Sequence, residues 1–284
     1  MPAAATPELR SLTWATDLDA LPAQRVFERR EGFLAVRSPE NPGHYWGNLL
    51  MFEDAPRAGD GERWEQLFEG VFADQPRVRH RTFAWDRTDG AVGAAGEEFV
   101  QRGYQLERFT GLLAAAREVR AHPRENREVL VRMLDARPGM DAALWEQAHA
   151  AQLASRDGRI RLDAESEFRR RRQRELRELF GACGGGCYVA LDPSGEELLA
   201  SCFVVLGGTR ASIHDVDTVE RHRRRGICSR LLVEAVRDIE ARAQPHAFVI
   251  AADPDYHALG LYESLGFRAV ESCAGVCRMP SDSR

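Results

Sequence analysis

The residues best suited to chemistry in this 284-residue chain lie where a predicted strand at 211–219 leads into a predicted helix at 226–242. The connecting loop contains three consecutive arginines followed by Gly226-Ile227-Cys228-Ser229. The first N–H groups of a helix have no partner within it, and the helix dipole adds positive potential there. Glycine allows a tight backbone path, and arginine attracts phosphate. The sequence therefore predicts an anion site suited to phosphate groups.

Two motifs in the second half of the chain resemble those of the GNAT superfamily of acyl-CoA N-acyltransferases. The loop resembles the signature R/Q-x-x-G-x-G/A, with Arg223, Gly226 and Cys228 at the defined positions and cysteine in place of Gly or Ala. The segment 258–267, ALGLYESLGF, resembles the family block A-x-x-L-Y-x-x-L-G-F. The resemblance implies an α/β fold with a mixed, bent β-sheet. Its fourth and fifth strands would splay apart to admit the pantetheine arm of acetyl-CoA.

The same resemblance implies which residues hold this acyl donor. Main-chain groups of the fourth strand would pair with pantetheine, and N–H groups of the loop would hold the pyrophosphate. The family often has Asn seven residues before the tyrosine of the second block, and here that residue is Asp255. No metal is expected. The predicted cofactor-binding residues are Val216, Asp217, Thr218, Arg223, Arg224, Arg225, Gly226, Ile227, Cys228, Ser229 and Asp255.

Acylation of an amine needs a proton acceptor, an oxyanion donor and a proton for the departing thiolate. The resemblance places Tyr262 near the CoA sulfur as the acid, and a backbone N–H of the fourth strand as the oxyanion donor. His214 is the candidate base, although a histidine on a half-buried strand that makes one structural hydrogen bond fits the sequence equally well. Asp215 and Asp217 are expected on the opposite strand face from His214 and are weaker candidates.

The two halves of the chain share one order of elements, which indicates a duplication. Glu97–Tyr104 matches Gly260–Phe267 as a short helix closed by glycine and an aromatic residue, and Phe99 stands where Tyr262 stands. The corresponding loop of the first half, 53–62, lacks R-x-x-G-x-G and carries four carboxylates. We therefore predict two tandem GNAT-like domains, similar in layout to mycothiol synthase. Residues 1–116 would be a degenerate copy without CoA binding, 117–127 a linker and 128–284 the catalytic domain.

Hydrophobic periodicity and turn residues give the expected elements. For the first half they are a strand at 45–52, a helix at 60–73 and a strand at 79–85. For the second half they are strands at 129–134, 187–191, 197–206, 211–219 and 247–252, with helices at 141–154, 164–180 and 226–242.

Composition bounds the remaining properties of the protein. The formal net charge is −5 and the sequence pI is near 6.0, which argues against nucleic acid as a partner. No apolar run is long enough to span a membrane, and the first residues do not resemble an export signal, so the cytoplasm is expected. The chain has no lysine, and its six cysteines are expected to be reduced thiols; a zinc site at Cys183/Cys187 and Cys273/Cys277 is the less favoured interpretation.

Two segments leave alternatives open. The run Arg169–Arg174 fits a solvated helix face better than a surface that attracts an acidic acceptor. The segment Asn41–Asn48 fits either a turn with packed aromatic residues or part of an acceptor pocket.

The sequence thus predicts an N-acetyltransferase that transfers acetyl from acetyl-CoA to a primary amine of a small molecule or peptide, as a monomer or homodimer. The alternative is a non-catalytic acyl-CoA-binding or assembly protein, which would show no turnover with any amine.

Overall fold

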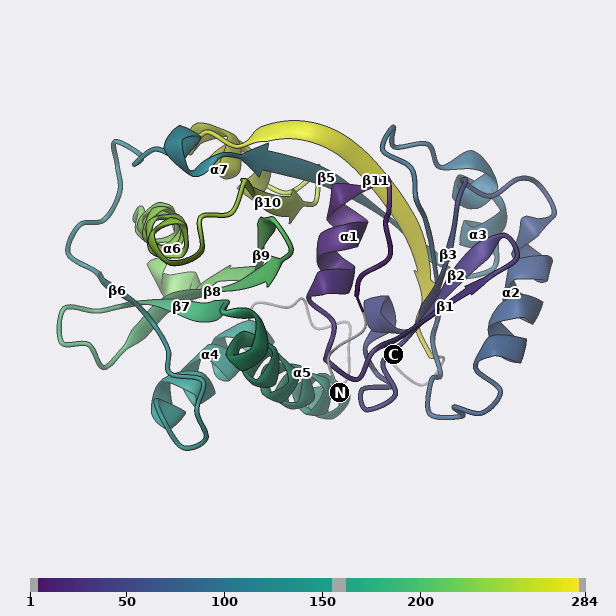
Figure 1. Ribbon diagram of the computed structural model, residues 1–284, viewed down its shortest axis with the longest axis horizontal. Helices are drawn as coiled ribbons and strands as arrows, with labels where there is room; N and C mark the ends of the chain where they lie inside the picture. The colour runs from purple at the N-terminus through teal and green to yellow at the C-terminus, as the bar shows by residue number, and fades with distance from the viewer. Residues whose placement is uncertain (1–4, 155–161, 281–284) are drawn as a thin grey trace. The chain divides into compact units, whose positions relative to one another are not determined.

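The computed structural model describes residues 5–154 and 162–280, and it confirms the α/β class with a mixed sheet flanked by helices (Figure 1). The chain divides into two compact units. The first comprises Met1–Gly111 with Glu271–Arg284, and the second comprises Leu112–Val270. This division differs from the predicted boundaries at both ends of the second domain. The predicted linker belongs to the second unit, and the C-terminal residues belong to the first.

The first unit has a sheet of strand order β1-β2-β3-β4-β11, in which only the β3–β4 pair is parallel. The helices α2 and α3 cover one face and α1 covers the other, each through its own apolar cluster. The strands are β1 (Val26–Arg30), β2 (Phe33–Arg37), β3 (Leu49–Phe52), β4 (Arg81–Trp85) and the end of β11 (Arg268–Arg278); the helices are α1 (Leu12–Asp19), α2 (Asp60–Val71) and α3 (Glu98–Gln101), followed by β5 (Gln105–Ala114).

Aromatic side chains fill the core between α2 and the sheet of the first unit. The ring of Trp64 lies parallel to that of Phe52 at 3.6 Å between centroids, and Phe83 and Phe99 pack against the same indole. These buried rings bury a large apolar area, which stabilises the unit.

Two strands contribute residues to both units. Ala274 and Val276 of β11 are buried in the aromatic core of the first unit, where Gly275–Arg278 pairs antiparallel with β4. Leu112 and Ala114, at the end of β5, are buried in the core of the second unit. The physical reason for the shifted boundaries is therefore that each half of the sequence supplies the end of one strand to the core of the other unit.

The second unit has the strand order β10-β9-β8-β7-β6, and only the β10–β9 pair is parallel. Helix α6 covers one face of its sheet, while α4 and α5 cover the other (Figure 1). The elements are β6 (Leu130–Met133), α4 (Ala142–Ala154), α5 (Leu162–Cys183), β7 (Gly186–Leu191), β8 (Leu198–Gly207), β9 (Arg210–Thr218), α6 (Ile227–Ala243), β10 (Ala247–Ala252) and α7 (Ala258–Ser264).

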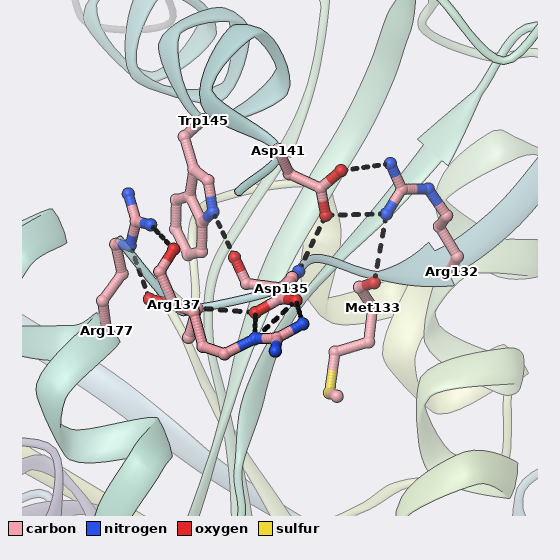
Figure 2. Close-up of polar contacts among 8 residues, drawn as sticks. Arg132, Met133, Asp135, Arg137, Asp141, Trp145 and Arg177 are labelled. Atoms are coloured by element: carbon pink, nitrogen blue, oxygen red, sulfur yellow. Dashed lines mark hydrogen bonds and ion pairs between the residues drawn. The ribbon is translucent and has the colours of Figure 1, made fainter. Parts of the chain in front are cut away.

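The connection from β6 to α4 is held by a network of polar contacts (Figure 2). Asp141 pairs with both terminal nitrogens of Arg132 at 2.8 and 2.9 Å and accepts a hydrogen bond from the backbone N–H of Asp135. The indole N–H of Trp145 donates to the carbonyl of Asp135, and the Arg177 guanidinium lies 4.9 Å from the centre of that Trp145 ring. These contacts fix the start of α4 against α5.

The segment Asn41–Asn48 is a packed turn of the first unit. The expected strand at 45–52 is wrong in its first part, because Tyr45–Gly47 forms the 3-10 helix η1 and β3 starts at Leu49. The buried Asn48 side chain causes this turn. Its amide nitrogen donates to the carbonyls of Asn41 and His44, and its oxygen accepts from the backbone N–H of Ser38.

The remaining 3-10 helices are η2 (Gly93–Gly96), η3 (Ala116–Glu118) and η4 (Glu220–His222). Within the part of the chain that the structure describes, no helix is long and apolar enough to cross a membrane.

Candidate functional site

The strands β9 and β10 separate along their length. They pair in parallel from Arg210↔Ala247 to Ile213↔Ile250, although β9 continues to Thr218 and β10 to Ala252. The backbone of β9 beyond Ile213 is therefore released from this partner. This is the opening between the fourth and fifth strands of the unit that the family resemblance implies.

The same stretch of β9 contains a β-bulge against β8. Phe203 opposes His214 and Ser201 opposes Asp217, so that two residues of β9, Asp215 and Val216, oppose the single residue between them on β8. Asp215 has a φ of 47°, in the left-handed region. The bulge overturns the expectation that Asp217 lies on the opposite face from His214. Ser201 and Phe203 are two positions apart on β8, so their side chains lie on one face of the sheet. Their partners on β9, Asp217 and His214, lie on that same face.

A cavity of about 620 Å³ lies at the opened end of β9, in the second unit. It brings together nine of the eleven predicted cofactor-binding residues and the predicted acid Tyr262. Arg225, Asp255 and His214 are not among its lining residues. The lining consists of Val216, Asp217, Thr218, Glu220, His222, Arg223, Arg224, Gly226, Ile227, Cys228, Ser229, Tyr256, His257, Ala258, Leu261 and Tyr262.

The wall formed by the start of α6 presents unpaired hydrogen-bond donors. Gly226 is the N-cap of α6, with a φ of 71°. Among the described residues, no acceptor is found for the backbone N–H groups of positions 226–229. The Arg224 side chain also has no polar partner within the described ranges, whereas Arg223 donates to the carbonyl of Thr218 at 3.2 Å. Free N–H groups and an unpaired guanidinium at a helix N-terminus can hold a phosphate group.

The predicted linker packs closely against Gly226 and Gly266, the glycines of the two motifs. A side chain at Gly226 would overlap the carbonyl of Arg124, and one at Gly266 would overlap the carbonyl of Glu118. Asn126 N–H donates to the carbonyl of Gly226 at 3.1 Å. Close packing of residues 118–126 therefore requires glycine at both positions, a reason for these glycines that the motif alone did not reveal.

Tyr262 lines the cavity from α7 and is only 5% exposed. Burial, with smaller contributions from Cys228, Cys202 and Asp217, raises the pKa of its hydroxyl well above the usual value. The shift favours the neutral hydroxyl, so Tyr262 carries its proton at neutral pH. The neighbouring Cys228 is half-buried, and desolvation raises the pKa of its thiol to about 12. This thiol is a small neutral wall residue rather than a nucleophile.

His214 lies on the face of β9 that is covered by α5. It opposes Phe203, whose ring contacts Phe180 of α5 at 5.9 Å between centroids. Its Nε2 is 2.7 Å from the hydroxyl of Ser212. His214 is half-buried and is not among the residues that line the cavity.

The sequence interpretation missed an aromatic pair at the cavity. Tyr256 and His257 lie just before α7, with ring centroids 4.0 Å apart, and both rings are exposed. Leu261, next to Tyr262, also lines the cavity. The helical spacing from Tyr262 to Ala258 and the adjacency of Leu261 are the sequence signals that could have indicated this wall.

The arginine run on α5 is not uniformly solvated. Arg169 and Arg172 are buried, whereas Arg170 and Arg174 are exposed. The six cysteines are all free, and no group of metal-ligating side chains is found within residues 5–154 and 162–280.

Comparison with known proteins agrees with this architecture. Residues 151–267 match the family model described as Acetyltransferase (GNAT) family. Members of this family transfer acyl groups from acyl-CoA. No curated protein matches the sequence.

Three solved structures share the fold at low sequence identity. A conserved protein of unknown function from Staphylococcus epidermidis ATCC 12228 has a TM-score of 0.71 at 11% identity, over 88% of this chain and 92% of that one. A GCN5-related N-acetyltransferase from Kribbella flavida has a TM-score of 0.59 at 12% identity, over 95% of each chain. A tandem GNAT protein from the clavulanic acid biosynthesis pathway has a TM-score of 0.54 at 13% identity, over 100% and 92%.

Proposed function

We propose that this protein is an N-acetyltransferase whose second unit binds acetyl-CoA and transfers the acetyl group to a primary amine of a small molecule or peptide. The cavity would hold the pantetheine arm beside Val216–Thr218 and the pyrophosphate at the N-terminus of α6. The proposal rests on the family match, the opened strand pair and the free N–H groups at one end of the cavity.

The observation that carries this proposal is an internal anion site in the first unit. There α2 also begins after a left-handed glycine, Gly59, with a φ of 88°. The N–H groups of Gly59 and Gly61 donate to the two carboxylate oxygens of Glu98 at 2.9 and 2.8 Å. The loop geometry that the two units share therefore binds an anion where one is present.

In the second unit the corresponding position holds an apolar side chain. Glu98 lies one residue before Phe99, and Leu261 lies one residue before Tyr262, each on the short helix closed by Gly103 or Gly266. The second unit therefore has no internal carboxylate at this position. An anion for the N–H groups of Gly226 and Cys228 would have to come from a ligand, and the pyrophosphate of CoA fits that requirement.

The proposed reaction is direct attack of the neutral amine on the thioester carbon. The C–N bond forms, and the carbonyl oxygen becomes an oxyanion stabilised by a backbone N–H of β9. When the tetrahedral intermediate collapses, the C–S bond breaks and Tyr262 donates its proton to the departing thiolate. His214 would take the proton from the amine, directly or through water.

The direct test is release of free CoA thiol from acetyl-CoA in the presence of a panel of small primary amines and peptides with free N-termini. Acetyl-CoA-dependent turnover with at least one amine, lost in Leu261→Glu, supports the proposal. Tight acetyl-CoA binding without turnover across the panel would instead support a non-catalytic acyl-CoA-binding protein. Absence of binding would contradict both.

A further inference from the structure

The bulge in β9 carries a backbone conformation that its sequence does not favour. Asp215 adopts a φ of 47°, a region that glycine enters freely and other residues enter at a cost. In the common bulge with a left-handed first residue, that residue is glycine. Aspartate enters this region more readily than most non-glycine residues but still at a cost, which contacts of its side chain can offset.

A buried arginine from the neighbouring helix contacts this residue. Nη1 of Arg169 on α5 lies 3.5 Å from Oδ1 of Asp215, and the Arg169 side chain is only 5% exposed. Burial raises the pKa of the Cys187 thiol on β7, and the charge of Asp215 raises it further. The carboxylate is therefore turned toward α5 and the sheet beneath it rather than toward the cavity.

The bulge and the opening of the strand pair coincide. The last β9–β10 pair is Ile213↔Ile250, and the bulged residues, Asp215 and Val216, follow within three positions. In the first unit, β2 and β3 pair in an unbroken register from Val36↔Leu49 to Phe33↔Phe52, and β3 stays paired with β4 to its end. The first unit, whose β2–β3 register is regular, is thus the unit whose parallel strand pair stays together to the end of β3.

We infer that Arg169 is a positioning residue for the acyl-donor site: by holding Asp215 it fixes the bulge that aims the backbone of Val216–Thr218 into the cavity. This inference rests on the proposed function, since it assigns how that backbone is placed for the thioester arm. Arg169 acts through Asp215 and touches neither the donor nor the acceptor. Asp215 serves as an anchored backbone position and not as the proton acceptor.

The test uses Arg169→Leu, Asp215→Gly and the double variant in the thiol-release assay. Arg169→Leu is expected to lower kcat/KM for acetyl-CoA by about tenfold to a hundredfold, because a shift of about 1 Å in a reacting group has effects of this size. Asp215→Gly is expected to stay within about threefold of the wild type, since glycine adopts the bulge without an anchor. The double variant should recover toward the Asp215→Gly value for the same reason.

Arg174→Leu is the matched control, because Arg174 lies exposed on the same helix; it should leave the rate unchanged. A double variant as slow as Arg169→Leu would overturn the inference, as would a loss of turnover in Asp215→Gly.

A second measurement does not depend on turnover. In thermal unfolding, the shifts of the two single variants should not add in the double variant, because the two side chains contact each other. Additive shifts would contradict the contact. Failure of the wild type to bind or turn over acetyl-CoA would instead remove the proposed function, while the unfolding cycle would still report on Arg169 and Asp215.

Discussion

The two units start a helix in the same way and differ in what the helix N-terminus binds. Both α2 and α6 follow a left-handed glycine, Gly59 in one and Gly226 in the other. In the first unit the carboxylate of Glu98 accepts from the N–H groups of the loop. In the second unit the equivalent N–H groups face a cavity. Both units thus have a helix start suited to an anion, and in the first unit a side chain of the chain itself supplies that anion.

The parallel strand pairs of the two units, β3–β4 and β9–β10, also differ in how far their pairing extends. In the first unit β3 and β4 pair to Phe52↔Trp85, and Asp86 N–H then donates to the carbonyl of Phe52 at 2.8 Å. In the second unit the pairing of β9 with β10 stops at Ile213↔Ile250. A closed pair cannot admit a pantetheine arm between its strands. We therefore expect no acetyl-CoA site in the first unit, where the strands stay paired and Glu98 occupies the N–H groups.

The largest effect is expected from transferring the internal carboxylate to the second unit. In Leu261→Glu the new carboxylate should occupy the N–H groups of positions 226 and 228, as Glu98 does in the first unit. Two charge-assisted hydrogen bonds are at stake, so acetyl-CoA affinity should fall by about a thousandfold. Titration calorimetry measures this loss. Leu261→Gln is the control of equal size without the charge and should bind at least about tenfold better than Leu261→Glu.

The next largest effect concerns the residue that replaces tyrosine in the first unit. Tyr262→Phe reproduces Phe99 and removes the proton donor, so kcat should fall by about a hundredfold while acetyl-CoA affinity stays within about threefold. Steady-state kinetics combined with titration separates the two quantities. An unchanged kcat would mean that the thiolate receives its proton elsewhere, and Tyr262 would then be a core residue only.

The first unit should be the acid-sensitive one. His80 is 2% exposed, its Nε2 lies 3.0 Å from the carbonyl of Asn48, and burial lowers the pKa of its imidazole to about 4. Below the unfolded pKa of about 6.5 the unfolded state binds the proton and the folded state does not. Stability is therefore present above pH 6.5 and lost as the pH falls toward 4.

When the pH falls from 7 to 5, protonation of His80 in the unfolded state should lower the free energy of unfolding by about 2 kcal/mol. Denaturant unfolding followed by tryptophan fluorescence at the two pH values measures it. The His80→Gln variant should show a smaller loss over the same range. An equal loss in both proteins would assign the acid sensitivity to other groups.

The smallest effect is expected from emptying the anion site of the first unit. Glu98→Leu removes the acceptor for the N–H groups of Gly59 and Gly61, and the unfolding free energy should fall by about 1 kcal/mol. No second acetyl-CoA site should appear, because β3 and β4 remain paired. A second site in this variant would show that Glu98 alone separates the two copies, and the role given to the strand pair would then be wrong.

Most of the candidate site could be predicted from the two motifs, because the site residues lie in short continuous segments of the sequence. The loop at 223–229 and the block around Tyr262 each encode a local structure, and the family resemblance supplied the strand opening between them. The bulge at Asp215 escaped sequence reasoning, since it depends on the register against β8. That register is a non-local property, and one extra residue reverses the face assigned to Asp217.

Long-range packing explains the other differences. Nothing in the C-terminal sequence indicates that Ala274 and Val276 belong to the core of the first unit, because the β4 partner of Val276 is Phe83, 193 positions earlier (276 − 83). The polar composition of the segment at 117–127 predicts a linker. Its backbone instead packs against Gly226 and Gly266. Polar composition predicts solvent exposure of side chains but not the contacts of the main chain.

Counting acetyl-CoA sites by titration calorimetry tests the central claim most directly. The wild-type chain and Glu98→Leu should each bind one molecule of acetyl-CoA per chain, and Leu261→Glu should bind none at concentrations that saturate the wild type. Two sites in the wild-type chain, or one undiminished site in Leu261→Glu, would contradict the assignment of a single acyl-donor site to the second unit.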